Sequence, residues 1–127
     1  MNEKTQYWLE IAEYDLETAA AMLDTGRYLY VGFMCHQVIE KTLKAAIADA
    51  EVDPPKSHRL RRLAALAGLY DQMDDGQRHF LDLVEPLSVD TRYPSEMSRI
   101  SSELSADRCR SIILQTQEIH EWIKARL

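Results

Sequence analysis

The sequence predicts an all-α protein, a compact up-and-down bundle of about five helices, and three observations support this. Glycine and proline are scarce, with four of each in 127 residues, which favours long helices over many short strands. Hydrophobic residues make up 46% and charged residues 28%, an ordinary balance for a globular protein. Apolar residues recur three and four positions apart, the period of an amphipathic helix. The length fits one helical domain, 1–127.

The first two predicted helices occupy 5–24 and 27–50. In the first, apolar residues recur at helical spacing, Asp15 lies beside their stripe, and Gly26 marks the end. The second is apolar nearly all round, which is typical of the central helix of a bundle. Two apolar stripes on one helix exceed what a short bundle can cover alone, so we expect a homodimer. The alternative is that a long loop covers the surplus.

Two shorter helices are predicted in the middle of the chain. The Pro54–Pro55 pair ends the second helix, because proline cannot continue a helix. Ser57 is a plausible N-cap for a third helix that runs to about Leu69. The turn at 74–76 offers capping groups for a fourth helix, which runs to about Leu87.

The last third of the chain is predicted to contain a loop and one long helix. The stretch 88–102 is polar and is interpreted as mostly irregular, and Ser105 is expected to cap the last helix. In that helix the inward positions follow steps of three and four residues: Cys109, Ile112, Thr116, Ile119 and Ile123. His79 and His120 are expected on the surface.

Composition limits the function classes. The net charge of −6 excludes a dominant nucleic-acid role, because phosphate neutralisation supplies most of the affinity of such proteins, but it leaves room for a local basic pocket. Cys35 and Cys109 lie in apolar helical patterns without metal-ligand spacing, so we expect buried free thiols. The chain has no Gly-rich phosphate loop and no metal-ligand cluster, so no cofactor or metal is predicted.

The sequence also predicts a cytoplasmic protein that does not enter a membrane. Its first residues, Met1 to Gln6, contain no apolar signal segment. Its apolar runs all fall short of the roughly 18 residues that a helix needs to cross a bilayer.

The densest polar cluster lies on the second predicted helix and consists of His36, Gln37, Glu40, Lys41 and Lys44. Residues four apart share a helix face, so Glu40 neighbours both His36 and Lys44. Glu40 could orient His36 as a general base, or the group could bind a polar ligand. The structural alternative is an ordinary Glu-to-Lys pair with a histidine packed at its edge.

A basic cluster lies at the predicted start of the third helix. Five of seven residues there are cationic or can become so: Lys56, His58, Arg59, Arg61 and Arg62. Cations at a helix N-terminus oppose the helix dipole, so their placement favours an anion site, with the phosphate of a nucleotide or RNA as the candidate. The alternative is neutralisation by Glu51 and Asp53 or by another helix.

The third candidate is the tripeptide Arg92-Tyr93-Pro94. Proline restricts the residue before it, so Tyr93 is predicted to be extended. Arg92 could form a forked contact with a carboxylate such as Glu40 or Asp15, or with a phosphate. Alternatively, the arginine simply ties a long loop to the bundle.

Four segments carry a family resemblance, in order and at suitable distances. They are 12–19, with the pattern Ala-x-x-Asp-Leu-x-x-Ala; 36–45, with Gln-x-x-Glu-Lys followed by Leu-Lys-Ala; 55–60, where a histidine leads into the third helix; and the tripeptide 92–94. In these segments the chain resembles the HEPN family, small helical domains of bacteria and archaea. The last helix fits this family by position and pattern only.

The resemblance implies a helical bundle that often forms a homodimer and often pairs with a minimal nucleotidyltransferase in a toxin–antitoxin-like module. It also implies a role in nucleotide binding. Carried onto this sequence, it assigns to one polar pocket the residues Gln37, Glu40, Lys41, His58 and Arg92. Secondary candidates are His36, Lys44, Arg59 and Tyr93.

One departure from the wider family bears on catalysis. Its ribonuclease members carry an arginine followed, after four to six residues, by a histidine, and no histidine here has an arginine at that spacing. The leading hypothesis is therefore a non-catalytic interaction module, with RNA not favoured as a partner. The second is a metal-independent RNA-cleaving toxin with a diverged site, using His36 or His58 as base and Arg92 to stabilise charge. The third is a purely structural dimer.

Overall fold

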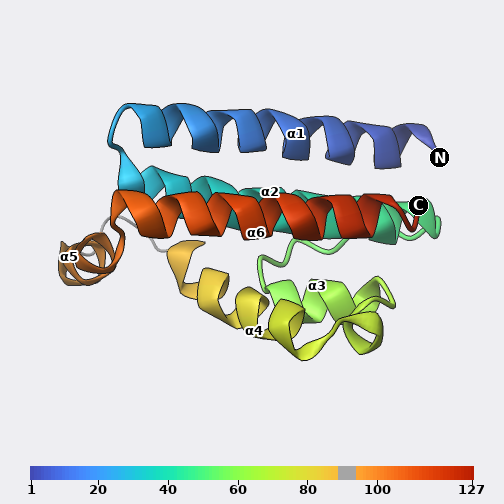
Figure 1. Cartoon of the computed structure of the whole chain (residues 1–127). Coiled ribbons are helices and arrows are strands. Elements are labelled where there is room, and N and C mark those ends of the chain that lie inside the picture. Colours follow the sequence, from blue (N-terminus) through green and yellow to red (C-terminus); the bar gives the residue numbers. More distant parts are fainter. Residues whose placement is uncertain (89–93) are drawn as a thin grey trace.

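The structure, a computed structural model, describes residues 1–88 and 94–127. In these ranges the chain forms six α-helices and two short 3₁₀ helices (Figure 1). Their bounds are α1 Glu3–Asp24, α2 Tyr28–Asp49, α3 Leu60–Leu66, η1 Tyr70–Gln72, α4 Asp75–Val84, η2 Glu85–Ser88, α5 Pro94–Glu103 and α6 Ala106–Lys124. The predicted all-α bundle is confirmed, with one helix more than the sequence indicated.

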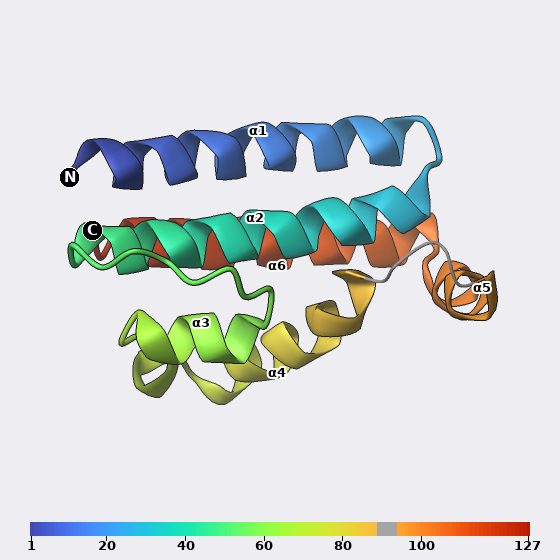
Figure 2. The same cartoon turned by 180° about the vertical axis from the view of Figure 1, so that it is seen from behind.

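α2 is the central helix. α1 and α6 run along it over nearly its whole length, and α3 and α4 lie on its other side (Figures 1 and 2). Fourteen of its 22 residues are buried, so the chain itself covers both apolar stripes. The stripes therefore do not require a second copy, and homodimerisation stays a prediction that rests on the family resemblance.

The turn between α1 and α2 shows why the first helix ends where the sequence predicts. Gly26 adopts φ of +73°, a left-handed conformation that only glycine takes without strain. The Arg27 amide then donates to the Met22 carbonyl at 2.8 Å, which closes the end of α1 and reverses the chain.

The third helix begins later than predicted, and Ser57 does not cap it. The Ser57 hydroxyl accepts a hydrogen bond from the Arg59 amide at 3.2 Å, in the turn before the helix. α3 starts at Leu60, whose amide donates to the Glu85 carboxylate at 3.2 Å, and it has only seven residues. A carboxylate from another helix therefore replaces the local cap.

The fourth helix begins as predicted. Asp74 forms a capping box with Gln77: the Asp74 carboxylate accepts from the Gln77 amide at 2.7 Å, and the Gln77 side chain accepts from the Asp74 amide at 2.9 Å. α4 ends at Val84, and a 3₁₀ turn continues to Ser88, so the predicted end near Leu87 is close.

The predicted irregular stretch contains a helix, α5, and this prediction was wrong. Ile100 and Leu104 lie four residues apart and are 2% and 6% exposed, so their side chains are buried against the bundle. Gly32 makes room for this packing, because a Cβ there would lie 3.2 Å from Leu87 Cδ1 and 3.4 Å from Leu104 Cδ1. Because this polar segment contains so few apolar residues, its sequence shows no helical period.

α6 begins as predicted, since the Ser105 hydroxyl accepts from the Arg108 amide at 3.1 Å. The five predicted inward residues of this helix are all buried. His79 is not buried, as expected, but the surface prediction for His120 was wrong, since His120 is 2% exposed.

His120 is held inside by a hydrogen bond to α2. The Thr42 hydroxyl donates to the Val38 carbonyl at 2.6 Å, so its oxygen accepts from His120 Nδ1 at 2.8 Å. The other ring nitrogen lies 3.6 Å from Glu13 Oε1. Burial lowers the pKa of His120, although Glu13 opposes this shift. Because burial favours the neutral ring, the hydrogen bond to Thr42, and not an ion pair, explains how His120 is accommodated inside the bundle.

Both cysteines are buried free thiols, as predicted. Burial raises the pKa of Cys35 to about 12, so this thiol stays protonated at neutral pH. Within the described ranges, the helices all fall short of the length and apolar character needed to cross a membrane.

Candidate functional site

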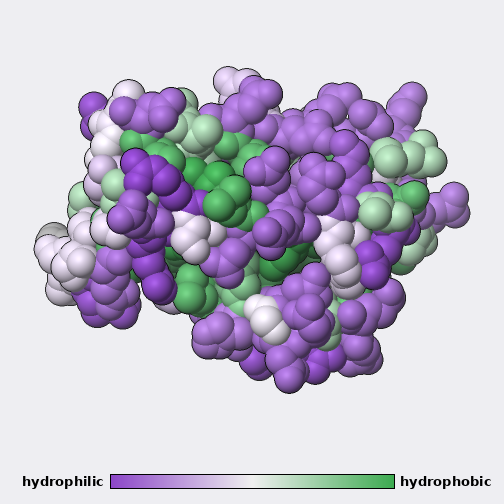
Figure 3. All heavy atoms as spheres, viewed as in Figure 1, coloured by the Kyte–Doolittle hydropathy of each residue, from purple (hydrophilic) through white to green (hydrophobic). Residues whose placement is uncertain are grey.

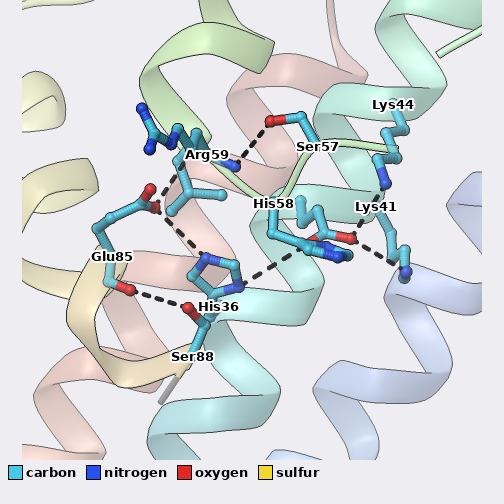
Figure 4. Close-up of polar contacts among 10 residues, drawn as sticks. His36, Lys41, Lys44, Ser57, His58, Arg59, Glu85 and Ser88 are labelled. Carbon is cyan, nitrogen blue, oxygen red and sulfur yellow. Dashed lines mark hydrogen bonds and ion pairs between the residues drawn. The ribbon is translucent and has the colours of Figure 1, made fainter. Parts of the chain in front are cut away.

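The polar residues of α2 and of the loop before α3 meet around the Glu40 carboxylate, which is fully buried. Figure 4 shows how His36, Lys41, Lys44 and His58 from these two segments lie close together. His58 Nδ1 lies 2.8 Å from Glu40 Oε1 and donates to it, because a carboxylate only accepts. Lys41 Nζ and Lys44 Nζ lie 3.2 Å and 3.3 Å from Glu40 Oε2. Glu40 thus joins α2 to a loop residue 18 positions later.

The surroundings keep Glu40 ionised. Burial alone would raise its pKa, but the hydrogen bond from His58 and the charges of Lys41 and Lys44 outweigh burial and hold the pKa below its usual range. Glu40 is therefore a carboxylate at neutral pH, and the two lysines more than balance its charge.

His58 is the member of this cluster that reaches the surface. Its side chain is 71% exposed while Nδ1 stays on Glu40. Its Nε2 has no partner among the residues that the structure describes. The geometry fixes the ring and leaves one nitrogen for a ligand.

His36 is buried, contrary to a role as an accessible base. Its Nδ1 lies 3.9 Å from Glu40 Oε1 and its Nε2 lies 3.4 Å from Glu85 Oε2, yet neither nitrogen makes a hydrogen bond within the described part of the chain. Burial lowers the pKa of His36, with Glu40 and Glu85 acting in the opposite direction. His36 therefore fills the space behind Glu40 and does not face solvent.

Trp8 of α1 completes the environment of the two lysines. Lys41 Nζ and Lys44 Nζ lie 5.4 Å and 5.6 Å from the centre of its ring, within the range of cation–π attraction. Their side chains are only 18% and 6% exposed. Nearby, burial raises the pKa of Asp15 although Lys41 opposes it. Both ammonium groups are thus held between the Glu40 carboxylate and the Trp8 ring.

The first amide of α3 is not free for the predicted anion. Glu85 already accepts from it, and the helix is short. An anion site beside the basic cluster stays a prediction. Asp53, one of the two acidic residues expected to neutralise the basic cluster, pairs instead with Lys4, at 2.7 Å. Another helix neutralises part of the cluster, since Arg61 pairs with Asp82 of α4 at 2.6 Å.

Several cations of the basic cluster stay available. Lys56, Arg59 and Arg62 have side chains with no hydrogen bond or ion pair within the described ranges, and all three residues are exposed. Lys56 and Arg59 flank His58 in sequence. An anion at this surface would therefore be bound by side chains and not by helix amides.

The structure brings together most of the predicted pocket. Gln37 is half-buried one helical turn before Lys41, and its amide has no hydrogen-bond partner among the described residues. Arg92 and Tyr93 lie outside the described residues. Sequence reasoning missed Glu85 and Trp8. Trp8 stood in an apolar stripe, and nothing in the sequence marks Glu85.

These features define a class of protein: an all-α bundle whose central helix carries a buried, ionised polar cluster. Two solved structures share the fold. The protein TT1696 from Thermus thermophilus has a TM-score of 0.86 and 19% identity over 99% of this chain and 100% of that chain. ST0689, described as an archaeal HEPN homologue, has a TM-score of 0.73 and 17% identity over 98% of each chain. At these identities the likeness shows the fold alone.

The HEPN domain family model matches residues 5–126, nearly the whole chain. The chain therefore belongs to the HEPN family, and the resemblance seen in four sequence segments is confirmed. The match also includes α6, which sequence motifs did not reach. No curated protein matches the chain.

Proposed function

We propose that this chain is a non-catalytic HEPN interaction module that binds a phosphate-bearing ligand beside His58. One observation carries the proposal: Glu40 fixes the His58 ring through Nδ1 while the side chain is 71% exposed. Lys56 and Arg59, which flank His58 in sequence, have no ion pair with any residue that the structure describes. Donors of this kind form strong, charge-assisted hydrogen bonds to phosphate oxygens. The overall charge of −6 limits the attraction to this local surface.

The buried residues of the cluster have a supporting role in this proposal. Glu40 orients His58, and Lys41 and Lys44 neutralise Glu40, so that its negative charge does not repel the ligand. Gln37 lies on the same side of α2 as Lys41, and its amide has no partner in the described part of the chain. Arg92 and Tyr93 stay candidates for the same ligand on the basis of the family resemblance.

Inorganic phosphate is expected to raise the melting temperature of the protein. A ligand at about one hundred times its dissociation constant adds roughly 2.7 kcal/mol to stability. In a domain of this size that corresponds to a rise of about 5 to 15 °C. The measurement is thermal unfolding with phosphate or ribose 5-phosphate against chloride at equal ionic strength.

His58→Ala is expected to abolish this rise, and His79→Ala is the matched control. His79 is an exposed histidine on α4, outside the cluster. The proposal fails if phosphate at millimolar concentration does not stabilise the protein, or if the two variants respond alike.

Homodimerisation and association with a minimal nucleotidyltransferase are the further parts of the proposal. Membership of the HEPN family supports both. A hydrophobic area between α1 and α6 on the face of Figure 3 also supports a protein contact. Sedimentation over a range of concentrations tests the dimer, and a monomer throughout would contradict it. Failure of a genomically adjacent nucleotidyltransferase to bind the purified chain would contradict the partnership.

The second candidate is metal-independent RNA cleavage, and the Glu40–His58 contact favours it. A carboxylate that holds Nδ1–H of a histidine leaves Nε2 as a general base, the arrangement that many hydrolytic enzymes use. RNA degradation that survives a chelator, is lost in His58→Ala and persists in His79→Ala would establish this activity. Absence of RNA cleavage by the wild-type chain would contradict this activity, and the binding module would stay the proposed function.

A further inference from the structure

The outer face of α1 has no role in the function proposed so far. One side of α1 packs on α2 and α6, and its opposite side faces away from the bundle (Figures 1 and 2). Along that side runs a line of exposed residues, three and four positions apart, which we call the outer strip. It consists of Glu3, Tyr7, Glu10, Tyr14, Glu17, Ala21 and Asp24.

The outer strip repeats every seven residues. Acidic residues take one position of the repeat, at 3, 10, 17 and 24, and Tyr7, Tyr14 and Ala21 take the other. A line with alternating steps of four and three residues is the seam along which two α-helices pair lengthwise. It extends over the 22 residues of α1, about 33 Å. The spacing therefore suits a second helix laid along α1.

Most of the net charge of the protein lies on α1. This helix contains six acidic residues and one lysine, a net charge of −5, and the whole chain has −6. Among the described residues, the four carboxylates of the outer strip form no ion pair, and only Glu10 accepts a side-chain hydrogen bond, from Gln6 at 3.3 Å. By contrast, the half-buried Glu13 pairs with Lys124 at 2.7 Å. The outer strip therefore attracts cationic partners.

The acidic residues of the outer strip do little for the stability of α1 itself. Glu3 lies in the first turn, where the helix dipole favours it, but Asp24 lies at the C-terminal end, where the dipole disfavours negative charge. The last turn contains no basic residue. The strip also contains no lysine or arginine that could pair with its acidic residues along the helix. A contact from outside the chain would compensate these charges.

The two tyrosines add an aromatic contact surface to the acidic row. Tyr7 and Tyr14 are 58% and 71% exposed, and their hydroxyl groups have no hydrogen bond in the part of the chain that the structure describes. Each ring has an acidic residue of the strip one helical turn away on both sides. A guanidinium that forms a forked contact with such a carboxylate can also lie against the ring. Exposed tyrosines are typical of protein interfaces.

We infer that the outer strip docks a basic α-helix of another protein, with arginine or lysine at heptad spacing opposite the acidic residues. A second copy of this chain is not the expected occupant, because two outer strips would place acidic residues against each other. The same charge repels nucleic acids and anionic membranes. The inference is independent of the phosphate site and does not require the partner to be a nucleotidyltransferase.

A synthetic helical peptide of three heptads tests the inference, with arginine placed opposite the acidic residues and leucine opposite the tyrosines. The control peptide has the same composition in an order that removes the heptad spacing. Fluorescence anisotropy measures both dissociation constants at an ionic strength of about 0.15 M, where charges more than about 8 Å apart are largely screened. The heptad peptide is expected to bind at least about fivefold more tightly than the control peptide.

Removal of charge from the strip is expected to weaken binding of the heptad peptide. Glu10→Gln/Glu17→Gln loses two exposed charge pairs, which corresponds to a loss of about 2- to 30-fold in affinity. Glu118→Gln/Glu121→Gln is the matched control, because it removes two exposed acidic residues of α6 and changes the net charge equally. It is expected to leave the affinity unchanged.

Removal of the rings is expected to weaken binding as well. Tyr7→Ala/Tyr14→Ala should lose more than about fivefold in affinity for the heptad peptide. Tyr30→Ala is the control and should bind normally, because Tyr30 is an exposed tyrosine of α2, 45% exposed. All these substitutions are at exposed positions, so the melting temperature should change little, and its measurement confirms that each variant is folded.

Three outcomes would overturn the inference. The first is equal affinity of the heptad peptide and the control peptide. The second is an equal loss of affinity in the two glutamine double variants, which would assign binding to net charge alone. The third is conversion of a dimer of the protein to a monomer by Tyr7→Ala/Tyr14→Ala in sedimentation, which would assign the strip to a second copy. The rise in melting temperature with phosphate should persist in every strip variant, so these outcomes leave the His58 site untouched.

Discussion

Replacement of Glu40 by alanine is expected to lower the free energy of unfolding by about 3 to 5 kcal/mol, because it leaves a buried charge without its partner. Lys44 is 6% exposed, and its ammonium group lies 3.3 Å from Glu40 Oε2. Without the carboxylate, Lys44 keeps only the face of Trp8, among the residues that the structure describes, to offset its desolvation. His58 also loses its one hydrogen-bond acceptor within the described residues.

Thermal or urea unfolding measures this effect, which corresponds to a fall in melting temperature of about 10 to 20 °C for a domain of this size. Glu17→Ala is the control, because Glu17 is an exposed glutamate on α1 with no partner in the described ranges. It is expected to change stability by less than about 0.5 kcal/mol. Equal effects of the two substitutions would show that Glu40 does not organise the cluster.

The contribution of Glu40 is also expected to depend on pH, and the sign follows from its lowered pKa. A group whose pKa is lower in the folded state than in the unfolded state stabilises the fold above its unfolded pKa, near 4.5. The contribution falls as the pH drops through the folded pKa. The stability difference between the wild-type chain and Glu40→Gln should therefore shrink below about pH 4.5. This difference removes the similar effects of Glu13 and Asp53, whose pKa values are also lowered.

Replacement of Leu43 by alanine is the second large effect, with an expected loss of about 2 to 5 kcal/mol. Leu43 is fully buried in the core cluster, one helical position from Thr42 and Lys44, so the substitution leaves a cavity at the centre of the bundle. The reason for the loss is the transfer free energy of the missing atoms together with the cavity that the neighbours do not fill.

Leu114→Ala provides the comparison for Leu43→Ala. Leu114 lies on α6 and is 60% exposed, so its truncation should change the free energy of unfolding by less than about 0.5 kcal/mol. A clear destabilisation by Leu114→Ala that depends on protein concentration would instead place this leucine in a subunit interface.

The regular part of the fold could be predicted from the sequence because its signals are local. Gly26, Asp74 and Ser105 mark helix ends through their own backbone or side-chain hydrogen bonds, and the apolar periods of α1, α2 and α6 are long. The errors concern long-range contacts. Glu85 caps α3 from 25 residues away, and the sequence near Ser57 contains no sign of it. α5 is buried through so few apolar residues that no helical period shows in its sequence.

The sequence predicted which residues form the site, but it did not predict how they are arranged. Helical spacing placed Glu40 next to Lys44 and His36, and the structure confirms both neighbours. The spacing could not show that the His58 ring returns to Glu40, because that contact depends on the path of the loop after α2. Nor could it show that His36 and His120 are buried, since a histidine on the edge of an apolar stripe fits either position.

The place of α6 in the bundle has a consequence for synthesis of the chain. α2 is complete once Asp49 has been added, but the helix that covers much of its apolar surface ends about 75 residues later, at Lys124. At about 5 to 20 residues per second, translation of that interval takes roughly 4 to 15 s. For this time α1 can cover one side of α2, but the side that α6 will cover stays exposed, which makes the nascent chain a substrate for chaperones that bind at the ribosome.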